Sequence, residues 1–397
     1  MDNLKPKLRF KQFSKPYIQK KLGDVTAFKN GKGHEQFVVP TGKYEIVNSK
    51  FISSGGEVKK YSEEQICPVF SGDILMVMSD VPKGKALAKT YLVKANDKYT
   101  LNQRICSLTP YNDYPVYLNY LINRNTYFLR FDSGVSQTNL RKEEVLNCPL
   151  VISNEIEEQK KIAAFLFTID NRISLLKEKH NLLSQYKEGV MQKLFKQEIR
   201  FKDENGDSFT SWQEFKVSDV LNLVLNPLKM KDESDYELIT VRRRNGGVDS
   251  RGIYKGKEVL VKTQFELKKN QFVISKRQIV HGACGIVPDE LEGAIVSNEY
   301  NVFEPVSSLL DIKFFNLFSQ TKYMKRSYFI NSDGVHIEKL LFKTQSWLKT
   351  KVSIPSVEEQ QKIVGFIESI DKKLQAINEQ IEHTETLKKG LLQQMFV

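Results

Sequence analysis

The feature that most constrains this chain is a long internal repeat. A shift of 201 positions, from Ile162 to Ile363, brings residues 157–162 (EEQKKI) onto residues 358–363 (EEQQKI). The match continues without a gap and ends at Phe195 and Phe396. A period of about half the chain is much longer than that of a solenoid repeat, so we interpret it as the duplication of one large module.

Both copies of the repeat predict a long helix that packs against a partner helix. Apolar residues recur at alternating four- and three-residue steps, which is typical of a coiled-coil seam. The seam positions are Leu166, Ile169, Ile173, Leu176, His180, Leu183, Val190 and Leu194 in the first copy, and Ile367, Ile370, Leu374, Ile377, Ile381, Thr384, Leu391 and Met395 in the second. Lys187 and Lys388 occupy one seam slot in each copy, so we expect the seam to drift there. Ser356 followed by Glu359 predicts a capping box at the start of the second helix.

The order of segments is domain, helix, domain, helix. One interpretation is a coiled-coil homodimer that carries two unrelated domains. We favour an internal antiparallel pair, because the second helix can then return the chain alongside the first. The predicted fold class is α+β: two similar mixed α/β domains separated by two long helices that pair as an antiparallel coiled coil with pseudo-twofold symmetry. The predicted boundaries are 1–150 and 198–350 for the domains, and 151–197 and 351–397 for the helices.

The two predicted domains repeat one layout. Residues 17–25 align with 212–220, and each segment leads into a domain with short strands. Strands are predicted at 44–47, 73–78 and 104–108, and again at 272–275. A single aromatic-rich helix is predicted at 116–131 and another at 314–329, each followed by a polar loop (133–139 and 331–334). Residues between these shared segments differ freely, which is typical of related binding domains with different targets.

The charge distribution favours a polyanionic partner. The 397-residue chain has a formal net charge of +12. Residues 1–150 carry 23 basic and 14 acidic side chains (+9), whereas residues 198–350 carry 23 and 21 (+2). A basic surface of this kind suits DNA or RNA, and a solvated basic surface kept for solubility is the alternative.

Motifs for catalysis, cofactors or metals are missing from the sequence. No GxxxxGK[ST] phosphate loop occurs, and the five histidines have no metal-ligand spacing. Asn226-Pro227 lacks the remainder of an amino-methyltransferase motif. The four cysteines lie far apart without a CxxC pair, so we expect buried, reduced thiols in a cytoplasmic protein. We therefore predict no catalytic, cofactor-binding or metal-binding residues and no membrane partner.

Candidate nucleic-acid contacts cluster in polar loops. Residues 241–247 (VRRRNGG) place three arginines between a predicted strand end and a glycine-rich turn. Arginine and lysine suit phosphates and guanine edges, and asparagine and glutamine suit adenine edges. The predicted DNA-binding residues are Lys83, Lys85, Gln103, Arg104, Gln137, Asn139 and Arg141 in the first domain, and Arg242, Arg243, Arg244, Lys276, Arg277, Gln278 and His281 in the second. An ordinary surface or turn role is the alternative for each of them.

With both halves laid out, the chain resembles the specificity subunit of type I restriction–modification systems. The resemblance covers essentially the whole chain. It rests on the duplicated helix motif that ends at Asp170 and Asp371, on the Asp-Val pairs at 24–25 and 219–220, and on the run 274–288 (ISKRQIVHGACGIVP) with 297–300 (SNEY).

The resemblance implies a function without catalysis. In that family each domain is a target-recognition domain that reads one half of a bipartite, asymmetric double-stranded DNA site, and the paired helices fix the spacer between the halves. It also implies two methyltransferase (M) subunits docked on the helices and restriction/translocase (R) subunits above them. S-adenosylmethionine, ATP and magnesium would belong to those partners. Two other classes remain as alternatives, an enzyme with built-in targeting and a coiled-coil scaffold that ignores DNA.

Overall fold

The computed structural model describes residues 5–82 and 84–396. The chain divides into two compact units, one formed by residues 1–178 and 379–397 and the other by residues 179–378. Each unit contains one mixed α/β domain and one part of each of two long helices, α6 (Ile156–Phe195) and α11 (Val357–Met395).

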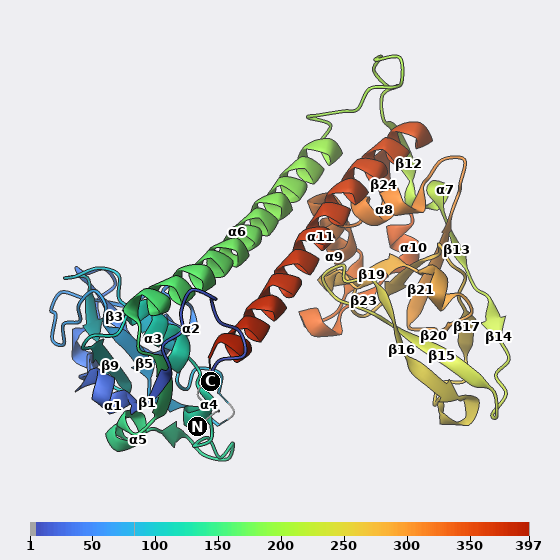
Figure 1. The fold of residues 1–397 in the computed structure, drawn as a ribbon. Helices are drawn as coiled ribbons and strands as arrows, with labels where there is room; N and C mark the ends of the chain where they lie inside the picture. The colour runs from blue at the N-terminus through green and yellow to red at the C-terminus, as the bar shows by residue number, and fades with distance from the viewer. Residues whose placement is uncertain (1–4, 83, 397) are drawn as a thin grey trace. The chain divides into compact units, whose positions relative to one another are not determined.

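The domain of the first unit is built from short strands and short helices (Figure 1). In chain order they are β1 (Tyr17–Lys21), α1 (Leu22–Val25), β2 (Thr26–Asn30), η2 (Glu35–Phe37), β3 (Tyr44–Val47), α2 (Ser49–Ser53), β4 (Tyr61–Ser62), β5 (Ile74–Val77), β6 (Ser79–Asp80), β7 (Thr90–Leu92), β8 (Tyr99–Leu101), β9 (Ile105–Pro110), α3 (Pro115–Ile122), α4 (Thr126–Leu129), β10 (Thr138–Asn139), α5 (Lys142–Leu146) and β11 (Pro149–Ser153). The main sheet has the antiparallel order β2-β9-β5-β7, and a second sheet has the order β4-β3-β8.

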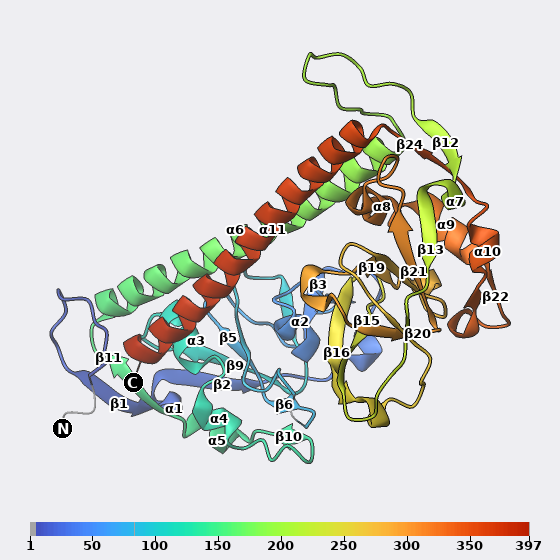
Figure 2. The same cartoon turned by 90° about the vertical axis from the view of Figure 1, so that its right-hand side faces the viewer.

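The domain of the second unit repeats this plan with a larger second sheet (Figure 2). Its elements are β12 (Gln213–Lys216), α7 (Val217–Val220), β13 (Leu221–Val224), β14 (Pro227–Leu228), β15 (Asp235–Val241), β16 (Val248–Lys255), η3 (Gly256–Glu258), β17 (Gln264–Glu266), β18 (Phe272–Ser275), η4 (Ile279–His281), β19 (Cys284–Ile286), η5 (Asp289–Leu291), β20 (Ile295–Ser297), β21 (Tyr300–Pro305), α8 (Ile312–Phe318), α9 (Lys322–Ile330), β22 (Ser332–Asp333), η6 (Ile337–Lys339), β23 (Leu341–Phe342), α10 (Thr344–Trp347) and β24 (Lys351–Ile354). The order β13-β21-β18-β19 matches that of the first main sheet, and a five-stranded sheet β14-β17-β20-β15-β16 lies beside it.

One central strand in each domain has a continuously apolar sequence because it is buried on both faces. The four side chains of β5 are fully buried and alternate between two cores: Ile74 and Met76 join α3, whereas Leu75 and Val77 join α2 and β8. Strand β18 behaves in the same way, with Phe272 in one core. A strand buried on both faces shows no polar alternation, because successive side chains point to opposite faces and both faces are covered.

The long helices pair antiparallel within each unit. In the first unit Lys388 Nζ lies 2.5 Å from Asp170 Oδ1, and Lys177 Nζ lies 2.6 Å from Glu385 Oε1. In the second unit Lys187 Nζ lies 2.5 Å from Asp371 Oδ1. The two lysines that interrupt the apolar seam are therefore held by ion pairs across the helix pair, and both pairs use residues of the duplicated motif.

The predicted fold class is confirmed, and one class of element was predicted wrongly. Each predicted aromatic-rich helix is two helices, α3 and α4 in the first domain and α8 and α9 in the second. Arg124 has φ +57° and Asn125 caps α4, so the chain turns between α3 and α4. Thr321 caps α9 in the same manner, because its side chain accepts a hydrogen bond from Met324 N. Local capping ends these helices although the aromatic spacing continues through the break.

Candidate nucleic-acid interface

Two polar loops of the first domain meet at one place. Strands β6 and β10 pair antiparallel, so that Ser79 faces Asn139, and Leu140 N donates to Met78 O at 2.7 Å. Gln137 Nε2 donates to Ser79 Oγ (2.8 Å), and Ser79 Oγ donates to Asn139 Oδ1 (2.6 Å). The two predicted amide residues therefore form one hydrogen-bonded group on the surface, with their orientation set by a short β-ladder.

Arg104 reaches the same place through the backbone. Met78 N donates to Arg104 O at 2.9 Å, and Arg104 has φ +66°, so its exposed side chain leaves the turn before β9. Arg141 caps α5, where its backbone N donates to Glu144 Oε2 at 2.7 Å. The structure thus brings the segments of Gln137, Asn139, Arg104 and Arg141 around Met78.

The remaining predicted residues of the first domain are more scattered. Gln103 turns to Glu35 and donates to its Oε1 at 2.5 Å. Lys85 is exposed on the loop after β6, and the carboxylate of Asp80 fixes that loop by accepting from Ala86 N at 2.6 Å. Lys83 lies outside the described residues.

In the second domain the turn formed by residues 242–247, called here the arginine turn, hydrogen-bonds to the loop around η4. Arg244 and Asn245 have positive φ (59° and 56°), and their backbone amides donate to His281 O (2.7 Å) and Gly282 O (2.8 Å). Gly282 also has φ +74°, and an added Cβ there would approach Asn245 at 3.0 Å. The predicted residues from 242–244 and 276–281 are therefore adjacent, because two tight turns hydrogen-bond to each other.

Three of the four arginines in this cluster face carboxylates. Arg243 NH2 lies 2.9 Å from Glu338 Oε2, and Arg277 Nε lies 2.6 Å from Glu299 Oε2. Arg242 Nε is paired with Asp249. Glu338 also has its Oε1 3.2 Å from His281 Nε2. These carboxylates are not among the residues predicted from the sequence, although the nearly balanced charge of residues 198–350 indicates that many basic side chains there have acidic partners.

The two clusters occupy corresponding places in the shared scaffold. Phe342 N donates to Lys276 O at 3.0 Å, at the end of β18, as Leu140 N does to Met78 O just after β5. Gln278 is the N-cap residue that precedes η4, and its carbonyl accepts from Ala283 N at 3.2 Å. In both domains, then, the loop after the central strand meets the segment that follows α4 or α9, and the side chains presented there differ.

The duplicated Glu-Glu-Gln motif is internal rather than part of either surface. The carboxylate of Glu158 is fully buried and accepts from Arg9 Nε (2.7 Å), Arg9 NH2 (2.8 Å), Ser153 Oγ (2.5 Å) and Tyr17 OH (3.2 Å). The hydrogen bond to Glu158 raises the pKa of Arg9. Glu359 holds Arg200 in the same way, at 3.0 and 2.6 Å. The motif therefore anchors the segment that enters each domain to the start of the helix that leaves it.

The glutamine of the motif makes a second internal anchor. Gln159 accepts from Tyr114 N at 2.8 Å and donates to Ser153 O at 2.9 Å. Gln360 accepts from Asp311 N at 2.8 Å and donates to Pro355 O at 2.9 Å. Each glutamine ties the first helix after the main sheet to the start of a long helix.

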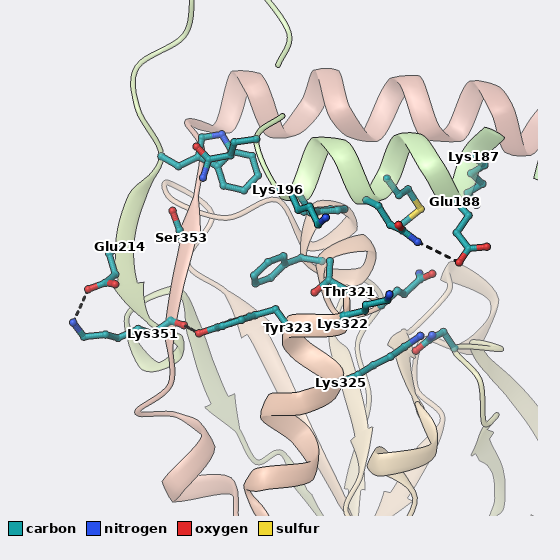
Figure 3. A pocket seen from close by; sticks show the side chains of 18 of the residues that line it. Lys187, Glu188, Lys196, Glu214, Thr321, Lys322, Tyr323, Lys325, Lys351 and Ser353 are labelled. Carbon is teal, nitrogen blue, oxygen red and sulfur yellow. Dashed lines mark hydrogen bonds and ion pairs between the residues drawn. The ribbon is translucent and has the colours of Figure 1, made fainter. Parts of the chain in front are cut away.

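A cavity of about 800 Å³ lies in the second unit, between the end of α6, the start of α9 and strands β12 and β24 (Figure 3). Its lining mixes aromatic and basic side chains, among them Trp212, Tyr323, Lys322 and Lys325. Lys351 on its rim pairs with Glu214 at 2.6 Å. Asn245 also lines it, so the cavity borders the arginine turn.

Residues 5–82 and 84–396 contain no group of three or more His, Cys, Asp and Glu side chains that is placed to hold a metal ion. No helix within them is long and apolar enough to cross a membrane. The four cysteines are free and buried, and burial raises the pKa of the Cys284 thiol to about 11 and that of Cys106 to about 12. The thiols of Cys284 and Cys106 are therefore neutral core side chains, because burial disfavours the thiolate form that nucleophiles need.

Most of the chain is similar to one family of known proteins. The family model of the type I restriction modification DNA specificity domain (Methylase_S) matches residues 15–185 and 210–384, once in each half. The chain is 24% identical over 402 residues to the type I restriction enzyme MjaVIII specificity subunit of Methanocaldococcus jannaschii, and the match covers 94% of this chain and 90% of that protein.

Two solved structures share the fold. One is the crystal structure of the type I restriction–modification S subunit from M. genitalium (TM-score 0.58, 17% identity, 99% of both chains). The other comes from work on complex assembly and conformational transition of the type I restriction–modification system (TM-score 0.58, 15% identity, 96% of both chains). The family match spans most of both halves, and the family is that of the subunits that confer specificity and carry no catalysis. This chain therefore belongs to the DNA specificity subunits of type I restriction–modification systems.

Proposed function

We propose that this chain reads a bipartite, asymmetric site in double-stranded DNA, with residues 1–150 reading one half and residues 198–350 the other. The observation that carries the proposal is that two loops converge at corresponding places in the two domains while presenting different side chains, Gln137 and Asn139 in one and Arg242, Arg243 and Arg277 in the other. A shared scaffold with exchanged loop residues suits two readers of different sequences.

The proposed contacts divide into affinity and specificity. Lysine and arginine side chains around each cluster would neutralise phosphates and supply salt-dependent affinity. Amide and guanidinium groups would read base edges in the major groove, amides favouring adenine and guanidinium groups favouring guanine. The residues proposed for these contacts are Lys83, Lys85, Gln103, Arg104, Gln137, Asn139, Arg141, Arg242, Arg243, Arg244, Lys276, Arg277, Gln278 and His281.

The long helices, residues 151–197 and 351–397, would fix the gap between the half-sites and dock two methyltransferase subunits, with restriction/translocase subunits added for cleavage. S-adenosylmethionine, ATP and magnesium would serve those partner subunits, which would flip the target adenine out of the duplex. Because two linked domains bind as a bivalent unit, the protein should bind weakly to DNA that contains only one half-site.

The experiment that tests this function is adenine-methylation sequencing of cells that express this chain with a type I methyltransferase subunit. Matched cells express the methyltransferase subunit alone. A two-part motif with a fixed gap, methylated once on each strand and present only with this chain, is the expected result. Absence of a new motif, although the two proteins co-purify, would contradict DNA reading by these domains.

A second arm assigns the half-sites. Replacement of Arg244 by alanine should change or weaken recognition of one half of the motif, and replacement of Asn139 by alanine should affect the other half. The same half of the motif responding to both variants would contradict the division of reading between the domains.

A further inference from the structure

The basic residues of the two clusters differ in how they are neutralised. In the second domain Arg243 pairs with Glu338, Arg277 with Glu299 and Arg242 with Asp249. In the first domain, within the described ranges, no carboxylate lies at ion-pair distance from the side chains of Lys85, Arg104 or Arg141. The net charges of the two domains, +9 and +2, follow the same division.

The backbone holds each pair in position. Lys276 N donates to Glu299 O at 3.0 Å, which fixes the segment of Arg277 beside its carboxylate partner. In the β15–β16 ladder Asp249 lies opposite Thr240, and Thr240 is two positions before Arg242 in the chain. Residue Glu338 lies in η6, on the loop that rejoins the cluster where Phe342 bonds Lys276. The carboxylates therefore belong to the architecture of the cluster.

A guanidinium group paired in this way keeps donors for a base. Arginine has five N–H donors, and a carboxylate on Nε leaves both terminal nitrogens free for the two acceptors of a guanine edge. Arg242 meets its carboxylate through Nε and Arg243 through NH2, whereas Arg277 uses Nε (2.6 Å) and also NH2 (3.5 Å). Each of the three guanidinium groups therefore keeps one terminal nitrogen, NH1, that is not bonded to its carboxylate partner. The paired group is close to neutral overall, however, so it attracts a phosphate much less than a free arginine does.

We infer that Glu338, Glu299 and Asp249 are specificity-determining positioning residues: they aim Arg243, Arg277 and Arg242 at a guanine-containing half-site and suppress phosphate binding by the second domain. The first domain then supplies most of the affinity for any DNA, and the second supplies most of the discrimination. This inference rests on the proposed function of DNA reading.

The test compares two DNA duplexes for each variant, with this chain purified as a complex with its methyltransferase subunits. One duplex carries the motif found by methylation sequencing, and the other carries a random sequence of the same length. Glu338→Gln is the principal variant and Glu299→Gln the second. Both carboxylates are largely exposed (57% and 47% of the side chain), so the variants should fold, which thermal unfolding checks.

A matched control lies in the hairpin of β15 and β16, at the end opposite the arginine turn. Glu233 pairs with Lys257 at 3.2 Å, just before β15 and just after β16, and it is 79% exposed. Glu233→Gln makes the same change of net charge far from the arginine turn, about seven strand residues or roughly 23 Å along β15. It therefore separates a local effect from a change in overall charge.

We expect Glu338→Gln to bind the random duplex about two- to fivefold more tightly than the wild-type chain, because it frees one arginine for phosphate. The slope of log K against log salt for that duplex should steepen by about 0.9, the contribution of one phosphate contact. Affinity for the motif should stay equal or fall, so the ratio between the duplexes should decrease. Glu233→Gln should leave the ratio unchanged.

Two results would overturn the inference while the proposed function stands. One is an equal gain on both duplexes, which is an effect of net charge alone. The other is a ratio and salt slope for Glu338→Gln and Glu299→Gln that match those of Glu233→Gln. A wild-type complex that prefers no motif would instead contradict the proposed function, and the inference would fall with it.

Discussion

Replacing Glu158 by glutamine should destabilise the first unit far more than the same change at its neighbour Glu157. The two residues are adjacent in the duplicated motif, but only Glu158 points inward. Its buried carboxylate accepts two hydrogen bonds from Arg9, whose side chain is only 11% exposed. The side chain of Glu157 is 70% exposed and has Lys160, one turn away, at 2.7 Å.

The magnitude follows from burial. Removing one partner of a buried ion pair costs roughly 3–5 kcal/mol, because the remaining charge is left without compensation. Glutamine keeps the volume and one acceptor oxygen, so we expect about 3 kcal/mol for Glu158→Gln. An exposed pair three residues apart on a helix contributes about 0.5 kcal/mol or less, which is the expected loss for Glu157→Gln.

Urea unfolding measures the difference with a built-in spectroscopic control. Both tryptophans, Trp212 and Trp347, lie in the second unit, so their fluorescence reports on that unit, while far-UV circular dichroism reports on the whole chain. With a typical urea dependence of about 1–3 kcal/mol per molar, a loss of 3 kcal/mol lowers the midpoint by about 1 M or more. Glu158→Gln should lower the transition seen by circular dichroism and leave the tryptophan transition nearly in place.

The duplicated motif provides the mirror experiment. Glu359→Gln, which removes the partner of Arg200, should lower the tryptophan transition, and Glu358→Gln should not. Midpoints for Glu158→Gln and Glu157→Gln that agree within about 0.2 M would refute the assignment of the motif as a buried anchor.

Three further predictions concern the helices and the cysteines. Lys388→Glu places a second carboxylate beside Asp170 and should lower the unfolding midpoint, whereas the exchange Asp170→Lys with Lys388→Glu should restore it; additive effects in this double-mutant cycle would argue against the pair. Adding seven residues to both helices should lengthen the gap in the methylated motif by about three base pairs, from roughly 10 Å of added helix, and an unchanged gap would contradict the spacer role. Burial raises the pKa of Cys284 to about 11 and that of Cys106 to about 12, so the unfolded thiols lose their protons first. The stability that these thiols contribute is present below about pH 8.5 and is lost as the pH rises through 11 to 12. The drop in urea midpoint between pH 7.5 and pH 10.5 should therefore be smaller for Cys284→Ala than for the wild-type chain.

The architecture could be predicted because its signals are periodic or repeated in the chain. The 201-residue repeat, the helical seam and the Ser356 cap are properties of local sequence, and they indicated the two long helices and the matched domains. Only the Ser356 half of the predicted capping box forms, because the carboxylate of Glu359 pairs with Arg200 instead. The prediction of a single helix at 116–131 and at 314–329 was wrong, because a local cap ends each first helix although the aromatic spacing continues into the second.

The roles of charged residues were decided only by tertiary structure. Arg9 meets Glu158 across 149 positions, and Arg243 meets Glu338 across 95. The sequence offers 48 acidic residues as partners, and no local pattern selects one of them. The motif Glu-Glu-Gln was visible as a repeat, but its burial was not. The sequence by itself therefore determined the modules and their order, whereas long-range packing decided which charges became internal anchors and which remained on the surface.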